Sequence, residues 1–536
     1  MSPLSHFANN ANASHTLFAS SKNRNFQLFL LIRSAMADSE PSISFLCVDR
    51  SVPEPDANFT CSEEQLKAKK DYWRDQMRNI KKVVAPMVDQ SELAFREFLR
   101  AHGADLAFSP MIHAHLFVND YTYRKTSLST WKGEREKPFI VQFCGNDSHT
   151  FLIACRYVEG FCDGVDLNLG CPQLIAKRGN YGAYLQEKRE LITSMVSAVY
   201  KKSTLPISVK IRCQDTVADT IEYAKQLEAA GASMITIHGR TREMKGINTG
   251  IADWSHIAAV KKELDIPVIA NGNIQLPGDV ERCIEATGCD AVMSAEGILF
   301  NPYLFEDTFK PNVQVAREYL SYAKRFAANM SAVRAHIFRI CHHTLLRHDD
   351  LRNKMSIITS LPDFHAIVNE LESRTATTPE DEANALPLLQ SHADFPDLRS
   401  FVEATPHWFA KPYVRPIQDD SKQADSEYRQ NKRAQIESLV EKTGLSKRQI
   451  RKKERRRVDL LRVKDAKKAY PQCVRCGMPA AVACQNASCK KCCRLRCIEE
   501  INGCKTHNFK AEHMKVKREA FLAAQSEVKE VVEATT

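Results

Sequence analysis

The stretch Val165-Asp166-Leu167-Asn168-Leu169-Gly170-Cys171-Pro172 has the composition of a buried strand that stops at a glycine and then presents a cysteine. Gly170 can adopt backbone dihedrals that other residues avoid, and Pro172 restricts the chain on the far side of Cys171. The pattern predicts a thiol held on a stiff loop at the carboxyl end of a strand. A small buried hydrophobe in a turn is the plain alternative for Cys171, so the surrounding chain has to decide between the two.

A repeated unit of a short apolar run, a turn and an amphipathic helix extends from about residue 80 onward. The apolar runs begin at Lys82, Asp105, Phe139, Val165, Ile207, Met234, Pro267 and Asp290. Most runs do not alternate apolar with polar residues, which is typical of parallel strands covered on both faces. Eight such units predict an α/β fold, a closed (β/α)8 TIM barrel. An open doubly wound sheet is the alternative, but no G-x-G-x-x-G follows the first strand.

Polar and small residues follow the predicted strands, which is where barrel enzymes carry their chemistry. This set comprises Pro86, Met87, Val88, Gln142, Asn168, Cys171, Lys210, Arg212, His238, Arg240, Asn271, Gly272, Asn273, Ala295 and Glu296. A single one of them would be an ordinary solvated loop residue, whereas such residues at nearly every strand end favour an active site. The last two loops expose backbone N–H groups among small residues, as a terminal phosphate requires.

Helical periodicity dominates residues 312–372, with helices expected at 315–325, 331–346 and 363–372. The second of these carries a basic set consisting of His336, Arg339, His342, His343, Arg347 and His348. Two interpretations of this set stay open, a solvated helix face and a face that contacts an RNA backbone. Residues 374–396 have the composition of a loose linker, and the aromatic segment 406–413 is expected to dock onto the preceding helices.

The formal net charge of +10 is concentrated in one segment, because residues 421–470 hold 17 Lys/Arg against 7 Asp/Glu. Eight of the 11 residues from 447 to 457 are basic. Such a run is typical of nucleic-acid binding, of nuclear import, or of both, and a solvated helix is the alternative.

Eight of the 18 cysteines lie between Cys473 and Cys504, and no secretory context is evident, so we interpret them as metal ligands. The candidate ligands are Cys473, Cys476, Cys489, Cys492, Cys493, Cys497, Cys504 and His507. Their short spacings predict two tetrahedral zinc sites, with an iron–sulfur cluster as the alternative. We expect Cys473/Cys476 to pair with Cys493/Cys497 and Cys489/Cys492 to pair with Cys504/His507, with Cys484 and His513 as substitutes. A module this small depends on its metal for most of its folding energy.

The first 75 residues show no periodic pattern and are expected to form a disordered extension. Their acid-poor start is similar to an organelle transit peptide, and an over-extended start with Met36 as the initiator is the alternative that we favour. No run approaches the roughly eighteen apolar residues of a membrane helix, so no membrane association is expected.

With these motifs assembled, the chain resembles the tRNA-dihydrouridine synthase family. The segments APMVDQSELAFR, VQFCGND, DGVDLNLGCPQ, ISVKIR, ITIHGRT, VIANGNI and SAEGIL occur in family order at family spacing within residues 78–372. The segments AKRGNYGAYL and HIFRICHHTL resemble the eukaryotic branch that acts at positions 16 and 17 of the tRNA D-loop.

The resemblance implies an FMN-binding barrel, a helical tRNA-binding domain, and NADPH or NADH as reductant. It makes Cys171 the proton donor, and Asn168 and Arg240 the residues that hold the target uracil. The implied flavin-binding residues are Pro86, Met87, Val88, Gln142, Lys210, His238, Asn271, Gly272, Asn273, Ala295 and Glu296. The family often has a basic residue in place of Glu296, so a carboxylate there would leave phosphate binding to backbone N–H groups.

The implied reaction reduces the C5–C6 bond of uridine and needs a hydride at C6 and a proton at C5. Cys171 must then be a neutral thiol, and the base must leave the folded tRNA to reach the barrel mouth. Two alternatives stay open: a free-pyrimidine dehydrogenase on a similar barrel, and a non-catalytic RNA-binding protein that retains a flavin barrel.

We therefore expect a flavin-dependent oxidoreductase organised in six segments. These are a disordered extension (1–75), the TIM barrel (78–310), the helical domain (312–415), a basic helical linker (416–470), a Cys-rich zinc-binding module (471–515) and a tail (516–536). We expect a monomer located in the cytoplasm, with the nucleus as a second location and mitochondrial targeting by the extension as a third.

Overall fold

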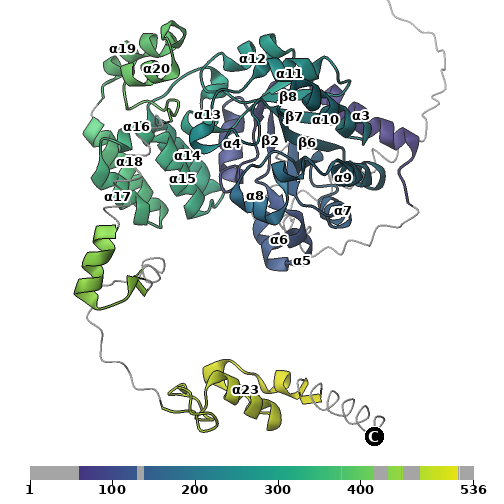
Figure 1. Ribbon diagram of the computed structural model, residues 1–536. Helices are drawn as coiled ribbons and strands as arrows, with labels where there is room; N and C mark the ends of the chain where they lie inside the picture. Colours follow the sequence, from purple (N-terminus) through teal and green to yellow (C-terminus); the bar gives the residue numbers. More distant parts are fainter. Residues whose placement is uncertain are drawn as a thin grey trace, which may run out of the picture. The chain divides into compact units, whose positions relative to one another are not determined.

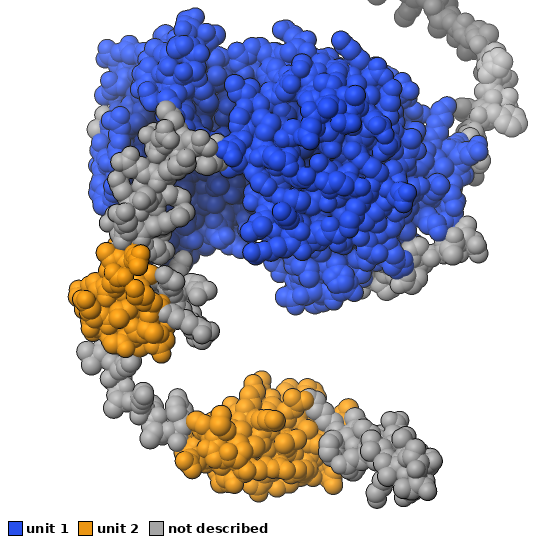
Figure 2. Space-filling view, in the orientation of Figure 1, with its two compact units in different colours: residues 1–418 blue, residues 419–536 orange. Residues whose placement is uncertain are grey.

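A computed structural model describes residues 59–128, 138–375, 377–415, 433–447, 449–450, 471–516 and 518–519. The chain divides into two compact units, residues 1–418 and 419–536 (Figure 2). Among the described helices, none combines the length and apolar composition that a bilayer span requires. The finer division into six segments stays a prediction.

The first unit contains a closed barrel of parallel strands (Figure 1). Its strands are β1 Lys82–Val84, β2 Leu106–Phe108, β3 Ile112–His113, β4 Phe139–Cys144, β5 Gly164–Asn168, β6 Ile207–Arg212, β7 Met234–His238, β8 Val268–Asn271 and β9 Ala291–Ser294. The order is β2-β1-β9-β8-β7-β6-β5-β4-β3, and pairing of β2 with β4 closes eight strands while β3 adds only to β4. All eight predicted strands are present, so the predicted (β/α)8 barrel is confirmed.

Helices and apolar side chains cover the barrel on the outside. The helices that follow the strands are α4 Leu93–Ala101, α5 Ala114–Asn119, α6 Tyr121–Leu128, α7 Ser148–Tyr157, α8 Leu174–Gly179, α9 Arg189–Lys202, α10 Val217–Ala229, α11 Trp254–Lys261, α12 Asp279–Thr287 and α13 Glu296–Phe300. Asp147, Thr216 and Asp253 cap α7, α10 and α11 by accepting a backbone N–H within the first turn. The strands are buried on both faces, as their non-alternating composition predicts.

Helix α3, Glu63–Gln76, corrects the prediction that all of residues 1–75 are disordered. Ser62 and Gln65 form a capping box at its start. Its Trp73 is fully buried in one cluster with barrel residues such as Val83, Leu106 and Ile140. The helix was missed because its sequence is mostly charged, and one of its two buried anchors is itself a charged residue, Lys69, which donates to Ser203 O at 2.7 Å. Residues 1–58, including Met36 and the proposed transit segment, lie outside the described residues.

The rest of the first unit is helical. The helices are α14 Asn312–Arg325, α15 Met330–Ile340, α16 His342–Leu345, α17 Asp349–Ile357, α18 Leu361–Thr375, α19 Pro379–Gln390 and α20 Leu398–Ala404. The helix expected at 331–346 is two helices, because the chain leaves helical geometry at Cys341, with φ −93° and ψ 17°. Beyond that break, buried Thr344 accepts a hydrogen bond from Asn312 Nδ2 at 2.7 Å.

Residues 374–396 are not a loose linker, because α19 occupies most of that segment. Thr378 and Asp381 form a capping box, and Pro379 sits at the first helical position, where a proline costs no hydrogen bond. Leu389 of α19 packs in a cluster with Phe401 and Phe409. The segment 406–413 docks as predicted, because the Ala410 N–H donates to Lys310 O at 2.9 Å and the Asn312 N–H donates to Trp408 O at 2.8 Å.

In the second unit the structure describes residues 433–447, 449–450, 471–516 and 518–519. Residues 433–443 are helical, and the cysteine-rich module, residues 471–516, contains helix α23, Lys490–Glu499. The basic residues 451–457 and most of the tail lie outside the described residues.

Candidate active site

The loop that carries Cys171 is held from both sides. Asn168, the last residue of β5, accepts the N–H groups of Gly170 and Cys171 on its Oδ1, at 3.3 and 3.0 Å. From the other side, the Ala183 N–H donates to Cys171 O at 3.1 Å. Gly182 has φ +65°, and a Cβ there would lie 2.8 Å from Cys171 O, so only glycine fits. The loop is therefore rigid, as the glycine and proline in its sequence predict.

A buried chain of hydrogen bonds through neighbouring strands holds the Asn168 side chain in place. Asn168 Nδ2 donates to Gln142 Oε1 at 2.9 Å, and Gln142 Nε2 donates to Asp166 Oδ2 at 2.8 Å. Ser208 Oγ donates to the other oxygen of Asp166 at 2.7 Å. Burial raises the pKa of Asp166 to about 6, although the bonds from Ser208 and Gln142 oppose the shift. Gln142, an implied flavin contact, is thus fully buried and bonded to two neighbours.

Sheet register brings Lys210 to the same end of the barrel, because Lys210 of β6 pairs with Asn168 of β5. Its Nζ donates to Asn271 Oδ1 at 2.8 Å, and Asn271 Nδ2 donates to Met293 O at 2.8 Å. Burial, together with Arg212, lowers the pKa of Lys210 to about 7, against the opposing influence of Asp166 and Cys171. Two predicted site residues, Lys210 and Asn271, are therefore in direct contact.

The Cys171 thiol is partly buried. Its side chain packs against a small buried cluster of Cys144, Ala176 and Tyr181. Burial raises the pKa of Cys171 above its ordinary value, opposed by Arg212 and Lys210. The thiol is therefore neutral at pH 7, and the nearby cations Arg212 and Lys210 interact electrostatically with it.

His238 and Arg240 follow β7 and contact each other. Arg240 Nη1 donates to His238 Nε2 at 3.0 Å, and Arg240 Nη2 donates to Asn273 Oδ1 at 2.5 Å. Burial and three nearby cations, Lys210, Arg212 and Arg240, hold the pKa of His238 well below its usual range. The imidazole is therefore neutral, with an accepting Nε2.

A cavity of about 240 Å³ opens at the carboxyl ends of β7, β8 and β9. The predicted site residues that line it are His238, Arg240, Asn271, Gly272, Asn273, Ala295 and Glu296. Cys171 and Lys210 do not line it, but Pro172 does, and Lys210 reaches it through its bond to Asn271. Gly272 shapes the wall, because a Cβ there would lie 2.7 Å from Ala252 Cβ and 3.0 Å from His238 Cδ2.

The structure does not gather Pro86, Met87 and Val88 at this cavity. Met87 instead lines a neighbouring groove of about 860 Å³ with Phe338, Arg339, His342 and Tyr413, where Ala295 and Glu296 also lie. Val88 is 55% exposed. The flavin-binding roles implied for these residues and for the cavity residues stay predictions.

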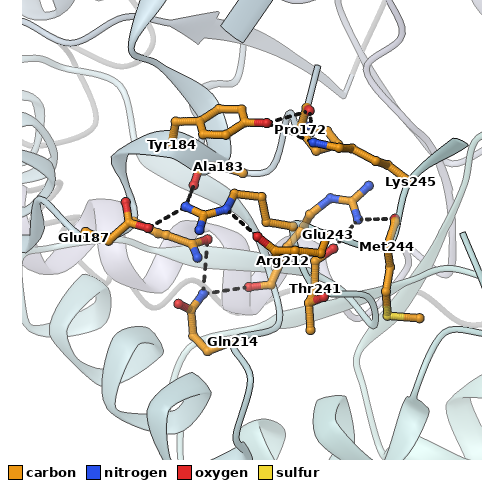
Figure 3. Close-up of polar contacts among 12 residues, drawn as sticks. Pro172, Ala183, Tyr184, Glu187, Arg212, Gln214, Thr241, Glu243, Met244 and Lys245 are labelled. Atoms are coloured by element: carbon orange, nitrogen blue, oxygen red, sulfur yellow. Dashed lines mark hydrogen bonds and ion pairs between the residues drawn. The ribbon is translucent and has the colours of Figure 1, made fainter. Parts of the chain in front are cut away.

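The loop after β7 reaches across to the Cys171 loop (Figure 3). Lys245 Nζ donates to Pro172 O at 3.0 Å and to the Tyr184 hydroxyl at 2.9 Å, and that hydroxyl donates to Pro172 O at 3.0 Å. Lys245 also lines the cavity. The sequence did not single out Lys245, because it lies in a loop with other charged residues, among them Arg242 and Glu243.

Arg212 makes a second connection between these loops (Figure 3). Its Nε donates to Gly170 O at 2.9 Å, and its Nη1 donates to Thr241 O at 2.7 Å and Met244 O at 3.1 Å. Arg212 ends β6 and lines the cavity. Its place at a strand end was visible in the sequence, but no role was assigned to it.

Glu296 is paired with an arginine that the sequence did not single out. Arg415 Nη1 and Nη2 lie 2.9 and 2.5 Å from the two carboxylate oxygens of Glu296, and Arg415 lines the same cavity. A guanidinium therefore stands beside the carboxylate, in addition to the backbone N–H groups that were expected to act alone there.

The basic set on α15 and α16 is not a uniform face. His336 is fully buried, and its Nε2 lies 3.0 Å from Glu92 Oε2, so it is neither solvated nor available to RNA. His343 Nε2 bonds to Pro412 O at 2.9 Å. Arg339 and His342 alone of this set line the open groove. Both interpretations are therefore wrong for His336, and for the rest of the set they stay predictions.

The cysteines of the second unit form two groups that could hold metal ions. One group is Cys473, Cys476, Cys489 and Cys492, and the other is Cys484, Cys493, Cys504 and His507; within each, the ligand atoms lie within 4.8 Å of one another. The Cys476 and Cys489 sulfurs are 3.7 Å apart, and Cys504 Sγ lies 3.5 Å from His507 Nδ1. Tetrahedral zinc with bonds of about 2.3 Å requires similar separations.

The predicted ligand pairing is wrong. Cys473/Cys476 group with Cys489/Cys492 rather than with Cys493/Cys497, and Cys484 is in the second group, as the substitute that was considered. Adjacent Cys492 and Cys493 do belong to different groups, as expected, because they project from successive positions of α23. Cys497 lies 4.0 Å from Cys493 and receives a bond from Asn486.

Residues 83–390 match the profile of the family described as Dihydrouridine synthase (Dus). A protein of Rattus norvegicus named "tRNA-dihydrouridine(16/17) synthase [NAD(P)(+)]-like" is 40% identical over 438 residues, covering 82% of this chain and 97% of the relative. A Schizosaccharomyces pombe protein named "tRNA-dihydrouridine(16/17) synthase [NAD(P)(+)]" is 37% identical over 378 residues, covering 66% of this chain and 93% of the relative. The Saccharomyces cerevisiae protein of that name is 38% identical, and the match covers 63% of this chain and 84% of the relative.

Proposed function

The chain belongs to the dihydrouridine synthase family, and from this premise we propose that it reduces uridine to dihydrouridine in tRNA, at positions 16 and 17 of the D-loop. The relatives that it matches over most of their length are named for that activity. The finer proposal is an FMN-dependent reduction with NADPH or NADH as reductant and Cys171 as proton donor.

One observation carries the assignment of the acid: a neutral thiol on a rigid loop beside a cation-lined cavity at the barrel mouth. The raised pKa of Cys171 keeps its proton at neutral pH, as a donor requires. In the proposed step, the Sγ proton moves to C5 of the uracil, and the resulting thiolate is stabilised by Lys210 and Arg212 before solvent reprotonates it. When bound, reduced FMN supplies the hydride to C6.

The residues present fit a phosphate-bearing flavin. Arg212, Arg240 and Lys245 line the cavity, and they donate hydrogen bonds to carbonyl groups and other neutral acceptors, so their charges are available to an anion. Gly272 lets the chain pass close to Ala252 and His238 at the cavity wall, where a Cβ would collide with both. His238, Asn271 and Lys210 would hold the polar edge of the flavin, and Asn168 and Arg240 the uracil.

We propose that the tRNA is held outside the cavity by the helical region and by the basic, metal-binding C-terminal part. The groove beside Met87 offers aromatic and cationic side chains, Phe338, Tyr413, Arg339 and Arg352, suited to stacked bases and phosphates. Two zinc ions in the cysteine module fit the thiolate-rich ligand groups. A monomer in the cytoplasm stays our expectation.

The test uses the purified full chain with FMN, NADPH and an unmodified tRNA transcript. We expect bound flavin, NADPH-dependent flavin reduction, and dihydrouridine mapped to positions 16 and 17. Reduction of free uracil without reaction on tRNA would favour a pyrimidine dehydrogenase, and tRNA binding without bound flavin would favour a non-catalytic RNA-binding protein.

A further inference from the structure

The cavity wall includes one residue that does not come from the barrel. Arg415 follows the helical region, 119 positions after Glu296, yet its guanidinium contacts both oxygens of that carboxylate. Both side chains are about one-third exposed, at 37% and 34%. An ion pair at that exposure contributes only about 0–1 kcal/mol to stability, so stability does not account for the arrangement.

Several contacts hold Arg415 in place without using its charge. Arg399 of α20 donates from Nη2 to the Arg415 carbonyl at 2.7 Å. Tyr413, two residues earlier, stacks on Phe300 of α13 with ring centroids 5.0 Å apart and planes 15° apart. The guanidinium therefore reaches the cavity from a segment that is fixed at both its backbone and its neighbouring ring, so little conformational entropy is lost when a ligand binds.

The donor count leaves Arg415 with capacity for a ligand. A guanidinium has five N–H donors, and the contact with Glu296 uses one from each terminal nitrogen. Among the described residues that line the cavity, Glu296 is the one carboxylate, and Arg415 offsets its charge; the other charged residues there are Arg212, Arg240 and Lys245. Without Arg415, Glu296 would present an uncompensated negative charge to an anionic ligand.

We propose that Arg415 binds the terminal phosphate of the flavin, so that the helical region completes the phosphate-binding site of the barrel. This inference rests on the proposed flavin-dependent function. Its consequence is that the cavity discriminates FMN from riboflavin, which lacks the phosphate, through a residue outside the barrel.

The test measures dissociation constants for FMN and riboflavin on flavin-stripped full-length protein by quenching of flavin fluorescence. In Arg415→Met, we expect FMN affinity to fall about 10- to 100-fold, the range of a charged hydrogen bond, and riboflavin affinity to be unchanged. Arg317→Met is the matched control, because Arg317 makes the same bidentate contact with Glu372 at 2.8 and 2.9 Å on the distant α14 and α18. It should alter neither affinity.

A double variant separates direct contact from charge cancellation. If Arg415 touches the phosphate, Glu296→Gln combined with Arg415→Met still binds FMN more weakly than Glu296→Gln alone. Equal FMN affinity of those two proteins would overturn the proposal, as would equal weakening of FMN and riboflavin in Arg415→Met. Failure of the wild-type protein to bind either flavin would instead contradict the proposed function itself.

Discussion

The barrel site and the cysteine module bring chemistry-bearing side chains together by different means. In the barrel, sheet register sets Asn168 beside Lys210 and Arg212 beside His238, and buried hydrogen bonds then fix the side chains. In the module, the described buried apolar residues are mostly the cysteines themselves, with Ala480 and Met514. We therefore expect the first site to persist without its ligand and the second to depend on the zinc ions proposed for it.

Removing the metal should therefore produce the largest effect. Chelation of the full-length protein is expected to unfold residues 471–516, because structural zinc supplies on the order of 10 kcal/mol in such modules. Hydrogen exchange, read peptide by peptide, should show lost protection there and unchanged protection in β1–β9. Retained protection in the chelated module would contradict the contrast between the two regions.

The ligand groups can be checked in the same protein. Cys484→Ser is expected to lower the bound zinc from two ions to one, whereas Cys497→Ser is expected to retain two. Of these two cysteines, Cys484 belongs to a four-ligand group and Cys497 does not. Metal content by mass spectrometry of the native protein distinguishes them. The reverse result would restore the pairing that was expected from sequence spacing.

The barrel and its helical region should respond as one cooperative unit. His336 and Tyr319 both contact the carboxylate of buried Glu92 on the chain segment before α4, at 3.0 and 2.9 Å. His336→Ala leaves that carboxylate short of a partner, so we expect a loss of about 3–5 kcal/mol in unfolding free energy. Urea denaturation measures it, with Arg317→Met as an exposed control expected to cost about 0–1 kcal/mol.

The contrary outcome is a His336→Ala variant in which the first unit keeps its full unfolding free energy and only the metal content of the cysteine module changes. The pair would then not couple the helices to the barrel.

Asp166 provides a smaller, pH-dependent test of the buried hydrogen-bond chain. Its pKa in the folded protein, about 6, lies above the ordinary 3.8, so the folded state binds the proton more tightly than the unfolded chain. The unfolding free energy therefore falls as the pH rises from about 4 to about 6, because Asp166 ionises more readily in the unfolded chain. Above about pH 6 the loss stays constant. Asp166→Asn should be stabilised relative to the wild type, on the order of 3 kcal/mol at pH 8, and the gain should nearly vanish near pH 4.

Thermal unfolding from pH 4 to 8 measures this gain. Glu263→Gln is the control, because Glu263 is an exposed carboxylate paired with Lys225 and its pKa is lowered by that contact, so its removal offers no gain at pH 8. A difference between Asp166→Asn and wild type that does not change with pH would contradict the assigned cause.

The strands and their end residues could be predicted from the sequence, whereas helices with few apolar anchors and contacts made by loops could not. Runs such as FIVQF and ISVKIR identified the strands, and because parallel strands end at one edge, the residues after them had to converge. Helices α3 and α19 were missed because charged sequences hide the few anchors, such as Trp73 and Leu389, that tertiary packing buries. Arg415 and the place of Cys484 were missed because loop paths, not spacing, bring them to their partners.

In the proposed reaction, the Cys171 thiol donates the proton to uridine. The most direct measurement is single-turnover reduction of unmodified tRNA by pre-reduced Cys171→Ala, with Cys283→Ala on α12 as a buried-thiol control outside the site. We predict that Cys171→Ala binds flavin and is reduced by NADPH normally, but forms dihydrouridine about 10²- to 10⁴-fold more slowly. Dihydrouridine formation in Cys171→Ala at the rate of Cys283→Ala would contradict the account.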